Sequence, residues 1–205
     1  MTEKQIILAA RIISLIFTPF YLPLVSMVVL FLFSYLSMQT FDYKISVLLL
    51  VYLFTILLPT LLIRFYRLHQ GWSPIELGIR ERRMVPYLIS ILCYFACYYI
   101  LMTNHFPYII GIVLLAALII QVVCALINVW WKISTHSAAI GGFGGGLIAF
   151  SFKYSFNPVS WLCLIIILAG LVGTARMILR QHTLSQVVAG FGVGFVCALN
   201  LIMRF

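Results

Sequence analysis

Long apolar runs separated by short polar segments make up most of the chain. A membrane-spanning helix needs about 20 mostly apolar residues, and after residue 43 a series of runs reaches or approaches that length. These runs cover residues 44–65, 85–102, 109–130, 138–152, 159–177 and 183–203. The pattern predicts a helical crossing of the membrane for each of them.

The first apolar run, residues 5–38, is harder to interpret because it contains Pro19 and Pro23. It is too long for one upright span and short for a hairpin, and proline interrupts helices. It either crosses once or dips into the membrane and returns. We predict an all-α, polytopic membrane bundle of six or seven transmembrane helices. It forms a single domain over residues 1–205, with 1–43 as an N-terminal apolar segment and 44–205 as the core bundle.

The composition supports a membrane protein and excludes several chemistries. Hydrophobic residues make up 64% of the chain and charged residues 8%, whereas a soluble domain carries roughly 25% charged residues. The only carboxylates are Glu3, Asp42, Glu76 and Glu81, and none forms a metal-ligand pattern with histidine. A two-metal hydrolase or a carboxylate-pair glycosidase lacks its ligands and catalytic groups. We therefore predict no metal and no cofactor.

Cysteines and glycines have simple structural explanations. All five cysteines lie inside apolar runs, where they behave as small hydrophobic residues rather than as disulfide partners or zinc ligands. Glycines recur at four-residue spacing between residues 141 and 146, and small residues recur between 189 and 194. This spacing is typical of close helix packing in membranes.

The order of crossings predicts which polar segments meet. Because successive crossings alternate direction, the loop 66–83, the segment 131–137 and residues 176–186 should lie at one face of the bundle. The side chains of interest there are Arg80, Arg82, Arg83, Lys132, Ser134, His136, Arg176, Arg180 and His182. Guanidinium groups clamp phosphate oxygens, and histidine can attack phosphorus or protonate a leaving oxygen. This set favours metal-free phosphoryl transfer. Alternatively, such cations simply anchor helix ends at the interface, which is our interpretation of the lone His69 and His105.

Three segments in this set resemble the motifs of integral-membrane type 2 phosphatidic acid phosphatases, a superfamily that includes lipid phosphate phosphatases and undecaprenyl pyrophosphate phosphatases. Ala175–Gln186 reproduces the spacing of Ser-Arg, five residues, His, three residues, Asp. Ile133–His136 looks like Pro-Ser-Gly-His, and Arg80–Pro86 is a loose version of the Lys and Arg-Pro motif. The resemblance covers roughly residues 75–195. It implies a phosphatidic acid phosphatase type 2 or haloperoxidase-like helical core, with motif segments 80–86, 133–136 and 175–186.

The same resemblance implies roles for individual residues. His182 would be the nucleophile and His136 the acid for the leaving group. Phosphate oxygens would be held by Arg176, Ser134 and a cation of the first motif, Arg83 or Arg80, with Lys132 beside them. Gln186 stands where the family has Asp, so the partner that orients His182 is neutral.

These observations lead to a functional hypothesis and an alternative. We expect a membrane phosphatase that hydrolyses a lipid phosphate or an isoprenoid pyrophosphate through a phosphohistidine, without metal. The alternative is a catalytically weak or silent relative that binds lipid phosphate or acts as a membrane partner subunit. The expected partners are this substrate and membrane lipids, and no nucleic acid.

The distribution of positively charged residues bears on which side of the membrane holds the site. The cations outside the site are Lys4, Arg11, Lys44, Arg64, Arg67, Lys153 and Arg204. If residues 5–38 cross once, they divide almost evenly between the two faces. If that segment returns, most lie opposite the site, which by the positive-inside rule makes the site non-cytoplasmic. We expect a protein of a bacterial inner (cytoplasmic) membrane with a non-cytoplasmic site, as in many bacterial members of the family.

Overall fold

The computed structural model describes residues 2–72 and 81–204, and within these ranges the regular elements are all helical. The α-helices are α1 (Glu3–Ile16), α2 (Leu22–Phe33), α3 (Phe41–Tyr52), α4 (Leu58–His69), α5 (Met84–Thr103), α6 (Tyr108–Trp130), α7 (Thr135–Tyr154), α8 (Val159–Ile178) and α9 (Leu184–Arg204). Shorter elements are the 3-10 turns η1 (Tyr35–Met38) and η4 (Glu81–Arg83) and a π-helical segment, η2 (Leu53–Leu57), which joins α3 to α4.

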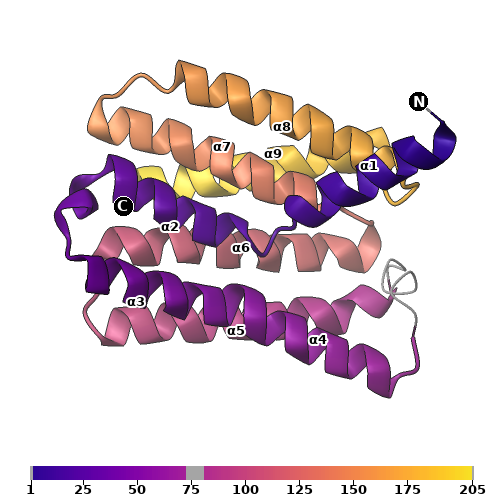
Figure 1. The fold of residues 1–205 in the computed structure, drawn as a ribbon, viewed down its shortest axis with the longest axis horizontal. Helices are drawn as coiled ribbons and strands as arrows, with labels where there is room; N and C mark the ends of the chain where they lie inside the picture. Colours follow the sequence, from indigo (N-terminus) through magenta and orange to yellow (C-terminus); the bar gives the residue numbers. More distant parts are fainter. Residues whose placement is uncertain (1, 73–80, 205) are drawn as a thin grey trace.

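The predicted membrane bundle is confirmed. Among the described residues, five helical stretches are long and apolar enough to cross a membrane. They are Phe41–His69, Met84–Thr103, Tyr108–Trp130, Val159–Ile178 and Leu184–Arg204. The glycine-rich α7 does not meet these criteria, yet it runs through the bundle between the same two ends (Figure 1). The described cysteines are free, as expected for cysteines in apolar helices.

The N-terminal segment crosses once, as a broken helix. α1 starts at the end of the bundle where α4, α6 and α8 finish, and α2 continues to the opposite end (Figure 1). The break lies between Ile16 and Leu22. Pro19 explains it, because proline has no N–H and disfavours a helical conformation for the preceding residue, Thr18. Of the two alternatives for residues 5–38, the structure therefore has the single crossing.

The single crossing removes one argument for a non-cytoplasmic site. The charge imbalance that favoured a non-cytoplasmic site required the first segment to return to the side from which it entered. With one crossing, the N-terminal cations lie at the same end as the site, and the remaining cations divide almost evenly. The positive-inside count therefore favours neither face.

Close, parallel packing of α7 against α9 brings two of the motif segments together. A methyl group on Gly141 would overlap the backbone oxygen of Phe191, and one on Gly145 would overlap that of Phe195. The residue offset is the same at both contacts, so the two helices run in the same direction and their N-termini lie at one end. The prediction that these glycines serve helix packing is confirmed.

Candidate functional site

The turn after α8 places His182 beside Arg176. α8 ends at Ile178, and Arg180 adopts a left-handed conformation with φ 52°, which is a common way to end a helix. The backbone N–H groups of Gln181 and His182 then donate to the carbonyl of Arg176 at 3.1 and 3.4 Å. The five residues between Arg176 and His182 thus form the end of α8 and the turn that follows it.

Gln186 orients the His182 ring and caps α9 with the same atom. Its Oε1 lies 3.0 Å from His182 Nδ1 and accepts the backbone N–H of Thr183 at 3.3 Å. The Gln186 N–H in turn lies 3.5 Å from Thr183 Oγ1, which completes the reciprocal pattern of a capping box. Because a backbone N–H can only donate, the shared atom must be the amide oxygen, and Nδ1 of His182 must carry the proton.

The other ring nitrogen of His182 is the one available for chemistry. The side chain is 6% exposed, and its Nε2 is buried without a hydrogen-bond partner among the described residues. Burial, followed by the positive charges of Arg83 and Arg176, lowers the pKa of His182 to about 3. The imidazole is therefore neutral near pH 7, and its lone pair is on Nε2.

Three cations, Arg83, Lys132 and Arg176, lie close enough to this imidazole to lower its pKa, and we call them the cationic cluster. All three act electrostatically on His182. Burial lowers the pKa of Arg83. Burial and the charges of Arg83 and Arg176 lower the pKa of Lys132. The three cations thus repel one another at a position where they are partly removed from water.

No carboxylate among the described side chains compensates the cationic cluster. Arg176 is 5% exposed; its Nη1 donates to Ser14 Oγ at 2.6 Å, and its Nε is buried without a partner in the described part of the chain. Nη1 of Arg83 is likewise buried and unpaired there. Burying guanidinium groups without a counter-ion is unfavourable. The arrangement is therefore suited to an anion that takes up these donors.

The second motif segment meets this cluster at the start of α7. His136 lies in the first turn of α7 and is partly exposed, and its Nδ1 is buried and unpaired among the described residues. It interacts electrostatically with Arg176, Arg83 and His182. Ser134 is the N-cap: its Oγ lies 2.9 Å from Ser137 Oγ, and its backbone N–H donates to the carbonyl of Gln186 at 3.3 Å. That backbone bond joins the second and third motif segments.

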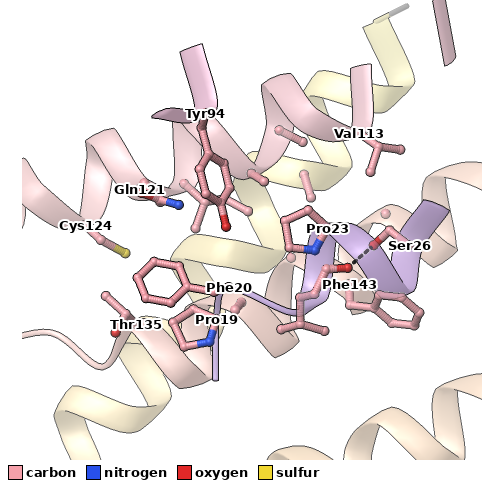
Figure 2. Close-up of a pocket in the computed structure, with 18 of the residues that line it drawn as sticks. Pro19, Phe20, Pro23, Ser26, Tyr94, Val113, Gln121, Cys124, Thr135 and Phe143 are labelled. Carbon is pink, nitrogen blue, oxygen red and sulfur yellow. Dashed lines mark hydrogen bonds between the residues drawn. The ribbon is translucent and has the colours of Figure 1, made fainter. Parts of the chain in front are cut away.

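A cavity of about 440 Å³ extends from His136 and Arg83 into the bundle. Its walls come from α2, α4, α5, α6, α7 and α9 and from the break between α1 and α2, and most of its lining is apolar. Figure 2 shows Tyr94 and Gln121 on one side of the cavity and Pro19, Phe20 and Pro23 on the other. The volume is within the range of about 300–1,000 Å³ that is usual for small-molecule sites.

Most of the side chains predicted for the site come together. His182, Gln186, His136, Arg176, Arg83 and Lys132 lie at one end of the bundle. Ser134 lies beside them, but the hydrogen bonds of its hydroxyl go to Ser137. Arg180 is exposed, and Arg80 lies outside the described residues. Among the described residues, no three His, Cys, Asp or Glu side chains gather as a metal site would require.

Sequence reasoning missed Ser14. This residue sits in an apolar run more than 100 positions from either histidine motif. No spacing rule connects it to Arg176, and an isolated serine in a membrane helix is ordinary. Only the packing of α1 against α8 reveals the contact.

A comparison with protein families agrees with this geometry. The family model of the PAP2 superfamily matches residues 129–205. This range contains the second and third motif segments and all of α7 and α9, whereas the loose first motif precedes it. Neither the curated proteins nor the solved structures that were compared gave a match. The match of residues 129–205, together with the two motif segments inside it, supports membership of the chain in the PAP2 superfamily.

Proposed function

We propose that this protein is a membrane phosphatase that hydrolyses a lipid phosphate or an isoprenoid pyrophosphate through a phosphohistidine on His182, without a metal ion. Membership in the PAP2 superfamily indicates a phosphatase-type activity. One observation carries the finer proposal: the neutral His182 has a free Nε2 among three cations that no described carboxylate compensates. A phosphate group would bring negative charge to these cations and a phosphorus atom to that nitrogen.

In the first step, the cationic cluster binds the phosphoryl oxygens and stabilises the charge of the transition state. The lone pair on His182 Nε2 attacks phosphorus, and the bond from phosphorus to the leaving oxygen breaks. His136 donates its proton to that oxygen; the dianionic substrate favours protonated His136 by offsetting the nearby positive charges. The Nδ1–H of His182 remains on Gln186 Oε1 and holds the ring in place.

In the second step, a water molecule replaces the leaving group. His136, now neutral, accepts a proton from this water as its oxygen attacks phosphorus. The P–N bond breaks, and its electron pair returns to Nε2 of His182. Inorganic phosphate leaves, and both histidines regain their starting protonation states.

The cavity supports a lipid as the carrier of the phosphate. It begins at two residues assigned to the chemistry, Arg83 and His136, and continues between apolar side chains toward Phe150 and Ile202. A water-soluble phosphate ester would leave this apolar volume without a ligand, whereas an acyl or isoprenoid chain would fill it. The protein is an integral membrane protein, so such substrates are present around it.

The alternative is a relative that binds lipid phosphate with little or no turnover. Gln186 favours it, because a neutral amide cannot stabilise the positive charge that develops on His182 during attack. Placement in a bacterial inner membrane, with the site on the non-cytoplasmic face, is a separate proposal that rests on the family resemblance alone. Comparing turnover of a membrane-impermeant substrate in intact and in inverted vesicles tests the orientation.

The experiment that tests the proposed function is phosphate release by purified protein from a panel of substrates. The panel contains a polyprenyl pyrophosphate, a diacyl and a monoacyl lipid phosphate, and a short water-soluble phosphate ester. We expect release from at least one lipid, resistance to EDTA, inhibition by orthovanadate, and loss of activity in His182→Ala. Loss on chelation that a divalent metal restores would contradict the metal-free mechanism. Orthovanadate binding without turnover would favour the alternative.

A further inference from the structure

The N-terminal helix contributes a residue to the candidate site from outside the part of the chain that matches the family. Ser14 is 9% exposed, and its Oγ accepts a hydrogen bond of 2.6 Å from Nη1 of Arg176. The Ser14 backbone also acts on the His136 imidazole. One residue of α1 therefore contacts a candidate phosphate ligand and lies near the candidate acid.

The break in the first crossing explains why the Ser14 backbone is available. The last carbonyl groups of a helix lack partners within that helix. Ser14 lies in the last turn of α1, and Pro19 prevents the helix from continuing through Thr18. The carbonyl of Ser14 is thus available to accept a hydrogen bond from the His136 imidazole.

Packing holds Ser14 in this place. Ile13 of α1 and Phe17, which directly follows the helix, pack against a buried cluster formed by Ile140, Ile165 and Val172 of α7 and α8. The position of α1 is therefore fixed by apolar contacts that do not involve the Ser14 hydroxyl. Removing only this hydroxyl should leave the fold intact while it frees the Arg176 side chain.

We infer that Ser14 is a positioning residue that presents Arg176 to a phosphate group. By accepting from Nη1, Ser14 restrains the guanidinium and leaves its Nε side, which has no described partner, for the anion. The planar guanidinium binds two oxygens at once only when its orientation is right. Arg176 without Ser14 keeps its charge but loses this orientation. The inference rests on the proposed function, since it assumes that a phosphate group is the ligand.

The test measures orthovanadate affinity and steady-state kinetics on the purified full chain. Ser14→Ala should weaken orthovanadate binding about tenfold, the effect of losing one hydrogen bond to a charged group. We expect KM to rise and kcat to change less. Ser14→Thr keeps the hydroxyl and should bind within about twofold of wild type. Ser46→Ala is the matched control, because the Ser46 hydroxyl bonds only within its own helix, to Asp42, away from the site.

The outcomes separate this inference from the proposed function. If wild type binds orthovanadate and Ser14→Ala binds it equally well, Ser14 has no positioning role and the proposed function stands. If Ser14→Ala binds more tightly, Ser14 competes with the anion, which also overturns the inference. If wild type neither binds orthovanadate nor releases phosphate, the proposed function fails first. A lower melting temperature in Ser14→Ala with equal losses in Ser14→Thr would indicate a purely structural role. Ser14→Cys, with a weaker acceptor of similar size, repeats the test if the alanine variant does not fold.

Discussion

Oε1 of Gln186 lies 3.0 Å from Nδ1 of His182, so a neutral amide occupies the place of the aspartate that the family motif has. The structure shows why an amide can still orient the ring. The Thr183 N–H donates to the same oxygen and prevents the amide from flipping. The ring therefore keeps the tautomer that leaves Nε2 free. What Gln186 lacks is the negative charge that would stabilise a cationic imidazole.

Replacing Gln186 by Asp should raise kcat more than it changes KM. In Ser-His-Asp hydrolases, an amide in place of the carboxylate costs about 10⁴ in kcat, largely because the histidine takes the wrong tautomer. Here the tautomer is already right, so we expect a smaller gain, about tenfold, from the added charge. Steady-state kinetics on the best substrate of the panel measure it. Fast wild-type turnover that Gln186→Asp does not improve would show that the amide is sufficient.

The His182 ring should remain neutral well below the usual histidine range. Its pKa is lowered to about 3 from the ordinary value of 6.5, so the folded protein takes up this proton only in strong acid. Nitrogen-15 NMR of labelled protein, assigned with His182→Ala, should show a neutral ring protonated on Nδ1 at pH 5. A titration of this residue near pH 6.5 would contradict the expectation.

The same depressed pKa predicts the sign of a stability change. Below pH 6.5 the unfolded chain binds a proton at His182 that the folded state does not bind until about pH 3. The contribution of this residue to folding stability is therefore present above pH 6.5 and is lost progressively as the pH falls toward 3. In thermal unfolding experiments, the His182→Gln variant should lose less stability than wild type over this pH range.

Arg176 should dominate phosphate affinity, because it is buried and has unpaired donors. Arg176→Lys keeps one charge but loses the fork of donors, and we expect orthovanadate affinity to fall at least about tenfold. Arg180→Gly is the matched control: Arg180 lies one turn away, is exposed, and has a positive φ that glycine tolerates. If both variants lose affinity equally, general positive charge rather than the Arg176 geometry would explain binding.

The contact between α7 and α9 should not accommodate one additional methyl group. Gly194→Ala would overlap the backbone oxygen of Ala138, whereas a methyl group on Gly192 meets nothing within 4 Å. We expect Gly194→Ala to destabilise the protein by about 1–3 kcal/mol or more and Gly192→Ala to behave like wild type. The midpoint of thermal unfolding in detergent compares the two. Equal midpoints would mean that the helices separate at little cost.

Much of the architecture follows from the sequence alone. Apolar length and alternating direction were enough to predict the crossings and to place the polar segments around His136 and His182 at one end, because a membrane forces helices to traverse it. The spacing from Arg176 to Gln186 was likewise sufficient to relate the third segment to its family. Local rules suffice here because the Arg176, His182 and Gln186 positions are joined by a single helix end, turn and helix start.

Tertiary structure decided the rest. Whether residues 5–38 cross once depended on what α1 and α2 pack against, since Pro19 is compatible with a break or with a return. The bond between Ser14 and Arg176, the double role of Gln186 Oε1 and the cavity beside His136 also required coordinates. These features arise where helices distant in sequence meet, and the energy of such contacts depends on positions within a few tenths of an ångström. A pattern of apolar and polar residues specifies which face of a helix is buried, but it does not specify which hydroxyl reaches which guanidinium across the interface.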